Sequence, residues 1–403
     1  MHTKTHIIIG SSAAGLSAAM TLSRHDVQAS IICISDEQEQ PYNKCFLVDY
    51  VSAGRSRQEL FTLRSSLTDN PNFTLLLGTT VTNIDPESAM VTIADGQVLR
   101  YDTLFMGMGG TAIKPLLPGM SSYAGVFTFY TLADIDKLMA YATQRAVRTA
   151  VVIGAGLSGL ECANAVCARG LQVTLVERGN RVLSHHTNQG GSLFIAQAAQ
   201  AIGVTIATMT EIKEITGHDG YVTSVLLSDG RSLSADVVIF AVGMRPNTAL
   251  AQEAGITLHE RHVNVDNQLQ TSVKNIFAGG DLVVAPCIVT GLLVPSTTWP
   301  DAVLQGSIAA YGMMGQARVY PGVIGHTVSQ FFGFDIASCG TLQGPSKRQS
   351  IVVESPDAYR VFEIEEGVLK AYCLIGSTGN AAMTCRRALL TKQPISPDEL
   401  RCL

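Results

Sequence analysis

The sequence predicts an α/β protein in which one strand–helix–strand module occurs twice and a smaller α/β domain follows. Residues 5–36 and residues 149–177 each read as a strand, a glycine turn, an alanine-rich helix and a second strand. Their strands are nearly continuous runs of Val and Ile, which indicates parallel sheets covered by helices on both faces. From about residue 319 the chain changes to short strands and turns, so a third domain is expected there.

The composition excludes several classes of protein. With 403 residues, 46% hydrophobic and 15% charged, the chain should be globular, with two or three domains. A net charge of −5 argues against a broad surface for nucleic acid or anionic membranes. No apolar run approaches about 18 residues and no signal peptide is seen, so a cytoplasmic protein without a membrane span is expected. Nine scattered cysteines without CxxC indicate reduced thiols, and no metal-site spacing is found.

A second pair of matching segments indicates a duplication. DGQVLRYDTLFMGMG (95–109) and DGRSLSADVVIFAVG (229–243) both begin with an Asp-Gly turn signal, carry Asp at the eighth position and end in glycine. Each segment follows its own copy of the strand–helix–strand module. Two coincidences in the same order favour duplication of the whole module.

The glycine turn of the second module matches a dinucleotide-binding fingerprint. Gly154, Gly156 and Gly159 follow the strand residues VVI and open a helix. The first glycine allows a tight turn, the second lets a pyrophosphate approach the backbone, and the third permits close packing of helix and strand. The helix N-terminus can hold the diphosphate, so Leu157 and Ser158 join the cofactor-binding candidates.

Glu177 ends the next strand and indicates which nucleotide binds. Its carboxylate can accept a hydrogen bond from a ribose 2′-hydroxyl and would repel a 2′-phosphate. We therefore expect NADH, with NADPH less favoured, although Arg178 and Arg181 weaken that preference.

The first module carries a less regular glycine turn, GSSAAG, in which Ser12 replaces the middle glycine. Its second strand is expected to end at Ser35, so the ribose carboxylate is displaced to Asp36 or Glu37. A later segment, TSVKNIFAGGD, compensates: its glycines let a cofactor lie close, and the carboxylate of Asp281 can accept hydrogen bonds from a polyol chain.

These motifs, taken in order, resemble those of a known family. The set GSSAAG, DTLFMGMGG, VVIGAGLSGLE, FAVGMRPN and IFAGGD is similar to that of the two-dinucleotide flavoprotein reductases, the pyridine nucleotide–disulfide oxidoreductase superfamily. The resemblance covers nearly the whole chain. It implies two Rossmann-like domains and an interface domain: an FAD-binding domain over 1–112 and 244–318, an NAD(P)H-binding domain over 113–243, and a C-terminal dimerisation domain over 319–403.

The resemblance also implies roles for single residues. Val81 would meet the adenine of FAD, Asp281 would bind its ribityl chain, and Glu161 would lie near the nicotinamide. The ATG-like turn usual in the family is replaced by Met106–Gly109, so contacts there are left open. The FAD pyrophosphate would be held by Gly10, Ser12 and Gly15. Further cofactor-binding candidates by position are Ala13, Ala14, Lys44, Gly109, Gly243, Gly280 and Trp299.

Cys45, in PYNKCFL, fits the single-cysteine branch of this superfamily: coenzyme A–disulfide reductases, NADH oxidases and peroxidases, and polysulfide reductases. It follows the second strand by about ten residues, and Lys44 could stabilise a thiolate beside a flavin. Two residues depart from the branch. Phe46 replaces a small residue, and Ala13 stands where the peroxidases and oxidases have a histidine.

The same stretch also resembles the rubredoxin and ferredoxin reductases and the flavoprotein part of assimilatory nitrite reductases. In that frame Lys44 replaces an arginine that can reach the FAD phosphate, and Cys45 replaces a proline. A Trp-Pro-x-Ala-x-x-Gln-Gly run within 289–315 also favours this branch.

The sequence therefore predicts an FAD-dependent NADH oxidoreductase. The first hypothesis is transfer of a hydride from NADH through flavin to a small-molecule sulfur acceptor, such as coenzyme A–disulfide or polysulfide, with Cys45 as the redox cysteine. The second is an electron-transfer reductase for a small redox protein or a nitrite-reductase-type partner, in which Cys45 is structural. The third is a flavin-binding sensor with little turnover. The family usually forms homodimers, so a homodimer is expected.

Overall fold

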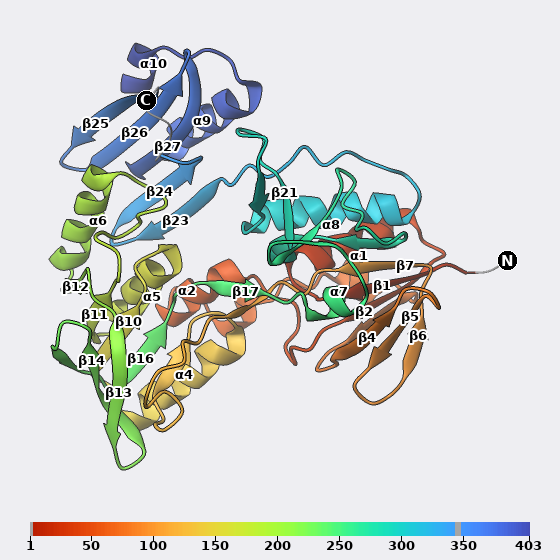
Figure 1. The fold of residues 1–403 in the computed structure, drawn as a ribbon, viewed down its shortest axis with the longest axis horizontal. Helices are drawn as coiled ribbons and strands as arrows, with labels where there is room; N and C mark the ends of the chain where they lie inside the picture. The colour runs from red at the N-terminus through yellow and green to blue at the C-terminus, as the bar shows by residue number, and fades with distance from the viewer. Residues whose placement is uncertain (1–2, 343–347) are drawn as a thin grey trace. The chain divides into compact units, whose positions relative to one another are not determined.

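A computed structural model describes residues 3–342 and 348–403 (Figure 1). The chain forms two compact units, each assembled from three separate stretches. The first unit contains the residues up to Cys45 together with 57–111 and 245–325, and the second contains 46–56, 112–244 and 326–403. Among the described residues no helix is long and apolar enough to cross a membrane.

The first unit is built on a five-stranded parallel sheet with the order β20-β7-β1-β2-β3. Its central strand is the Ile-rich run near the N-terminus, where Ile7 and Ile8 are fully buried, as expected for a strand covered on both faces. The strands are β1 (Thr5–Ile9), β2 (Ser30–Ile34), β3 (Phe73–Leu76), β7 (Thr103–Met106) and β20 (Ile276–Ala278).

Two helices, α1 (Ala13–His25) and α8 (Trp299–Met313), pack along each other in this unit (Figure 1). A Cβ added at Gly306 would lie 2.0 Å from the carbonyl oxygen of Ala14, so only glycine allows this approach. The other elements of the unit are short helices and the strands of two smaller sheets. They are β4 (Val81–Asp85), β5 (Met90–Ile93), β6 (Val98–Arg100), β18 (Leu258–His259), β19 (His262–Asn264), β21 (Val283–Pro286), β22 (Leu293–Pro295), η2 (Arg57–Leu60), α3 (Ser65–Thr68), α7 (Ala249–Glu253) and η3 (Gly280–Leu282). The strands of these two sheets pair antiparallel except for β19 with β21.

The second unit repeats this plan. Its five-stranded parallel sheet has the order β12-β11-β10-β16-β9, which matches β3-β2-β1-β7-β20 position by position. A three-stranded antiparallel sheet accompanies the parallel sheet in both units, so the duplication extends beyond the glycine turn. The strands are β9 (Val126–Thr128), β10 (Thr149–Ile153), β11 (Gln172–Val176), β12 (Thr205–Ala207), β16 (Val237–Phe240), β13 (Ile212–His218), β14 (Tyr221–Leu227) and β15 (Ser232–Ser234).

The helices of the second unit include one contributed by the N-terminal part of the chain. This short helix, α2 (Leu47–Val51), packs against α4 (Leu132–Arg145) and α5 (Leu157–Ala168). Arg169 donates hydrogen bonds to the carbonyl oxygens of Val51 and Tyr50. A further helix of this unit is α6 (Gln189–Ala201).

The C-terminal segment belongs to the second unit and forms a five-stranded antiparallel sheet, in the order β23-β24-β27-β26-β25. The predicted α/β character of the chain, including this segment, is confirmed. Its elements are β23 (Thr327–Phe331), β24 (Phe334–Cys339), β25 (Gln349–Ser355), β26 (Ala358–Glu365), β27 (Val368–Gly376), α9 (Gly379–Thr391) and α10 (Pro397–Arg401). The chain passes between the units five times: at η1 (Lys44–Phe46), after Ser56, in the paired strands β8 (Gly110–Ala112) and β17 (Met244–Pro246), and after Gly325.

The aspartate at the eighth position of each 15-residue segment has the same structural task in both modules. Asp102 accepts a hydrogen bond from the backbone N–H of Thr5 at 2.7 Å, at the start of β1. Asp236 accepts hydrogen bonds from the N–H groups of Arg148 and Thr149, both at 2.9 Å, at the start of β10. Each carboxylate therefore pairs backbone donors at the beginning of the central strand, where the sheet offers no partner.

Candidate cofactor-binding sites

The glycine turn of the first module is held by backbone contacts that exclude side chains. Gly10 has φ +99° and donates a hydrogen bond to the carbonyl oxygen of Ile34 at 2.8 Å. A Cβ added at Gly10 would lie 2.2 Å from the carbonyl oxygen of Gly107. A Cβ added at Gly15 would lie 1.7 Å from the carbonyl oxygen of Gly10. These two glycines are therefore required by the fold itself, whether or not a ligand binds.

The second module repeats this arrangement and adds one open position. Gly154 has φ +101° and donates to the carbonyl oxygen of Val176 at 2.8 Å, and a Cβ at Gly159 would lie 1.8 Å from the carbonyl oxygen of Gly154. At Gly156, by contrast, an added Cβ would meet no described atom within 4 Å. The protein does not need glycine there, whereas the close approach of a diphosphate does.

The helices that follow the two glycine turns begin without a side-chain cap. Ser12 at the start of α1 and Gly156 at the start of α5 make no side-chain capping hydrogen bond. Three other long helices, α4, α6 and α8, are capped by Thr131, Asn188 and Thr298, whereas α9 is not. The first N–H groups of α1 and α5 can therefore bind an anion, and the positive end of each helix dipole favours one. Around these turns Ala13 and Ala14 are buried, Leu157 is half-buried and Ser158 is exposed.

Glu177 lies directly after β11 and braces the turn beside it. Its Oε2 accepts a hydrogen bond from the N–H of Ala155 at 2.8 Å, and its Oε1 accepts one from Gly179 at 2.6 Å. Each carboxylate oxygen retains a further lone pair for a ribose hydroxyl. This geometry fits the role that its sequence position predicts.

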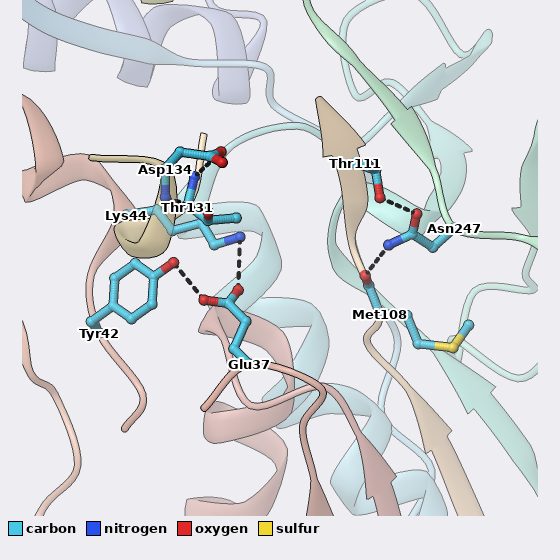
Figure 2. A network of polar contacts seen from close by, with 8 residues as sticks. All are labelled: Glu37, Tyr42, Lys44, Met108, Thr111, Thr131, Asp134 and Asn247. Atoms are coloured by element: carbon cyan, nitrogen blue, oxygen red, sulfur yellow. Dashed lines mark hydrogen bonds and ion pairs between the residues drawn. The ribbon is translucent and has the colours of Figure 1, made fainter. Parts of the chain in front are cut away.

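In the first module Ser35 stands directly after β2, where Glu177 stands after β11, and the acids Asp36 and Glu37 follow it. Strand β2 ends at Ile34, one residue before the expected Ser35, and Asp36 is exposed. The next residue, Glu37, accepts a hydrogen bond from the hydroxyl of Tyr42 at 2.7 Å and lies 3.4 Å from the Nζ of Lys44 (Figure 2). This acid therefore fixes the stretch that leads to Cys45.

Asp281 and Gly280 lie in η3, directly after β20. Gly280 has φ +74°, a left-handed conformation that favours glycine. Burial raises the pKa of Asp281, and the positive charge of Lys44 opposes that rise. The structure thus brings the two residues predicted to bind FAD, Asp281 and Lys44, into electrostatic contact.

The glycine-rich segment after β7, whose contacts the sequence leaves open, is fixed by Asn247. Its Nδ2 donates to the carbonyl oxygen of Met108 at 3.0 Å, its Oδ1 accepts from the hydroxyl of Thr111 at 2.8 Å, and its N–H donates to Gly109 (Figure 2). The backbone bond at Gly109 has a counterpart in the second module, where the carbonyl oxygen of Gly243 accepts from the N–H of Ile113 at 3.0 Å. Asn247 has no predicted role, although the GMRPN motif contains it.

Two further candidates lie in the first unit. Val81 begins β4 and is buried, with 6% of its surface exposed. Trp299 is the first residue of α8 and is half-buried against the core.

Glu161 lies on α5, where its Oε1 accepts a hydrogen bond from the hydroxyl of Ser329 at 2.5 Å. Burial raises the pKa of Glu161, the Ser329 hydrogen bond opposes the rise, and the charge of Asp49 adds to it. The hydrogen bond joins α5 to β23 within the second unit. Sequence reasoning gives Ser329 no role, because no motif marks it.

Cys45 lies on η1 and is exposed, and its N–H donates to the Oδ1 of Asn43 at 2.9 Å. Most other cysteines are buried or half-buried, and burial raises the pKa of Cys33 and Cys373 to about 12. Such thiols do not form the thiolate that sulfur chemistry needs. In the described part of the chain no cysteine forms a disulfide, and no cluster of His, Cys, Asp and Glu could hold a metal ion.

Comparison with known proteins identifies the family. A model of the pyridine nucleotide-disulphide oxidoreductase family matches residues 4–306. The chain belongs to this family. The predicted resemblance is confirmed, and so are the predicted cofactors: this family member is an oxidoreductase that depends on FAD and uses NADH.

Relatives of this reductase differ in their electron acceptors. It is 29% identical over 342 residues to an NADH oxidase of Methanocaldococcus jannaschii, covering 83% of this chain and 75% of that protein. It is 28% identical over 316 residues to the rubredoxin-NAD(+) reductase of Pseudomonas putida, covering 78% of this chain and 81% of that protein. The solved structure of a NAD-dependent persulfide reductase from A. fulgidus matches with a TM-score of 0.92 and 27% identity, covering 99% of this chain and 79% of that one.

The residues present fit both cofactors of the family. The glycine turns leave uncapped helix N-termini for two diphosphates, and Gly156 leaves clearance in the second. Acids suited to sugar hydroxyls follow, Glu177 after β11 and Asp281 after β20. FAD would supply hydride acceptance and electron release, and the chain supplies the binding groups.

Proposed function

We propose that this reductase passes a hydride from NADH through FAD to a sulfur acceptor, such as coenzyme A–disulfide or polysulfide, with Cys45 as its single redox cysteine. The observation that carries the proposal is the exposure of Cys45 beside Lys44, on a loop that Asn43 and Glu37 fix. The likeness to a persulfide reductase over 99% of the chain supports the same acceptor class.

The chemistry of the acceptor step follows from a thiolate at Cys45. The thiolate attacks one sulfur of the acceptor's S–S bond, forms a mixed disulfide and displaces one thiolate. Two electrons from NADH then cleave the mixed disulfide, which releases the second product thiolate and restores Cys45. In sum, one NADH and one proton reduce one S–S bond, giving NAD+ and two thiols.

The cofactor assignments belong to the same proposal. FAD would bind across the domain formed by 1–112 and 244–318, NADH across 113–243, and residues 319–403 would form a homodimer interface. Glu177 favours NADH over NADPH because a 2′-phosphate would meet its carboxylate. Glu161, with its raised pKa, would lie near the nicotinamide. The FAD contacts would come from Gly10, Ser12, Ala13, Ala14, Gly15, Asp36, Glu37, Lys44, Val81, Gly109, Gly280, Asp281 and Trp299, and the NADH contacts from Gly154, Gly156, Leu157, Ser158, Gly159, Glu177 and Gly243.

The decisive experiment is an anaerobic NADH titration of the wild type and of Cys45→Ser, followed by the flavin spectrum, together with turnover of coenzyme A–disulfide and polysulfide. Before the titration each protein is treated with coenzyme A–disulfide and freed of the excess, so that Cys45 of the wild type carries a mixed disulfide. We expect the wild type then to take up a second electron pair beyond the flavin's own, which cleaves this mixed disulfide, and to show a long-wavelength thiolate-to-flavin band. Cys45→Ser should lose the band and at least about 10²-fold in sulfur turnover. Cys402→Ser, at the other exposed cysteine, is the matched control and should behave as the wild type.

A second candidate function is electron transfer to a small redox protein. It is favoured by the similarity to a rubredoxin-NAD(+) reductase, which covers 81% of that protein. In this case turnover with rubredoxin or a one-electron dye would be fast and indifferent to Cys45→Ser. Both titrated proteins would then take up a single electron pair and give the same spectrum.

A further inference from the structure

Gln305 is a fully buried polar residue on α8 whose amide joins two parts of the first unit. Its Oε1 accepts a hydrogen bond from the N–H of Gly280 at 2.7 Å, and its Nε2 donates one to the hydroxyl of Ser296 at 3.0 Å. Because a backbone N–H can only donate, the amide oxygen has to face Gly280. An amide is therefore well suited to this site, since it satisfies a donor and an acceptor without a buried charge.

The segment that Gln305 holds is intrinsically loose. Gly279 and Gly280 are consecutive glycines, so they lose more backbone entropy on ordering than any other pair of residues would. Gly280 adopts φ +74°, and Asp281 follows it directly in η3. The hydrogen bond to Gln305 restrains the turn at the residue before this carboxylate.

The helix that carries Gln305 is itself fixed against α1. A Cβ at the next residue, Gly306, would lie 2.0 Å from the carbonyl oxygen of Ala14, so the two helices meet within the first turn of α1. Ser17 donates a hydrogen bond to the carbonyl oxygen of Val303 at 2.7 Å, which extends the contact. The Gln-Gly pair thus connects the uncapped N-terminus of α1 with the Gly280–Asp281 turn.

We propose that Gln305 is a positioning residue for the flavin site, because its amide sets the Gly280–Asp281 turn relative to the N-terminus of α1. The inference rests on the proposed binding of FAD by these two elements. Without the amide, the N–H of Gly280 loses its partner and the turn becomes free to rotate. The binding of FAD would then have to order the turn, and affinity would fall accordingly.

The test compares the wild type with Gln305→Leu, Gln305→Glu and the control Gln316→Leu, whose side chain is exposed beyond the end of α8. FAD affinity, the flavin absorption bands and the flavin midpoint potential are measured. Gln305→Leu should bind FAD at least about tenfold more weakly, with shifted bands, while Gln316→Leu matches the wild type. Gln305→Glu still offers Gly280 an acceptor, but it places a carboxyl group at a fully buried position, so it should recover only part of the affinity.

Each outcome decides the inference. Gln305→Leu with wild-type affinity, spectrum and potential would overturn it, and would leave the FAD assignment intact. If Gln305→Leu does not fold, Ser296→Ala removes only the second partner of the amide and should weaken FAD binding by a smaller factor. An unchanged Ser296→Ala would then overturn the proposal. A wild-type protein that binds no FAD would overturn the proposed function and this inference together.

Discussion

The glycine turns of the two modules have glycine at the same outer two positions and differ at the middle one. The first and last glycines, Gly10 and Gly15 or Gly154 and Gly159, are surrounded by backbone atoms in both modules. The middle position is Ser12 in one module and Gly156 in the other. At Gly156 nothing in the described chain approaches an added Cβ.

This difference distinguishes two reasons for glycine in the motif, namely close packing of helix against strand and close approach of a ligand to the backbone. The outer glycines serve the crossing of helix and strand, so the fold requires them before any ligand binds. The middle glycine serves a ligand that comes close to the backbone. Duplicated modules therefore keep the outer pair and can change the middle residue as each adapts to its own dinucleotide.

The largest effect is expected from Gly159→Ala. Its Cβ would lie 1.8 Å from a backbone carbonyl oxygen, an overlap that no rotamer change can relieve. We expect a loss of about 3 kcal/mol or more in the free energy of unfolding, or failure to fold. Thermal and urea unfolding measure it. A variant as stable as the wild type would show that the outer glycine is not a fold requirement.

An intermediate effect is expected from Gly156→Ala, the matched substitution at the middle position. Stability should stay within about 1 kcal/mol of the wild type because no atom lies within 4 Å of the added methyl group. NADH should bind roughly tenfold more weakly, a cost of about 1.4 kcal/mol, since the methyl group occupies the path of the diphosphate. Titration calorimetry measures the affinity, and an unchanged value would remove Gly156 from the proposed NADH site.

The smallest effect concerns the starts of the central strands, where the modules also differ. His6 on β1 is fully buried, with Nδ1 2.7 Å from the hydroxyl of Thr103 and Nε2 3.1 Å from a carboxylate oxygen of Asp26. The paired positions in the second module, Ala150 and Val237, are apolar. The first module therefore carries a titratable group where the second has none.

Burial lowers the pKa of His6 from its ordinary value of 6.5, against the opposing effect of Asp26. Because the pKa of His6 is lower in the folded than in the unfolded protein, neutral His6 contributes its full stabilisation above pH 6.5. This contribution is lost as the pH falls through the lowered folded-state pKa. The double variant His6→Ala, Thr103→Val should lose this part of the pH dependence. Urea unfolding between pH 7.5 and pH 5 measures the free energy of unfolding of both proteins. An equal change of this free energy with pH in wild type and variant would contradict the prediction.

The sequence by itself determined the repeated architecture and the family, and with them the candidate cofactor-binding residues. Strand periodicity, the two glycine turns and the acid Glu177 are local signals, since their spacing along the chain fixes their spacing in space. The duplication was visible in the matched segments, although the hydrogen bonds of Asp102 and Asp236 were not. Local spacing therefore sufficed wherever a function lies within one strand–turn–helix unit.

The tertiary structure alone decided which distant side chains meet. Gln305 binds Gly280, Asn247 binds Met108, and Ser329 binds the carboxylate of Glu161, which is 168 positions away in the chain. Nothing in the spacing of these residues predicts a contact, because each pair forms only when separate elements pack in one register. The positions of these candidate residues therefore depend on long-range packing, whereas the motifs that mark the candidates lie within short stretches of sequence.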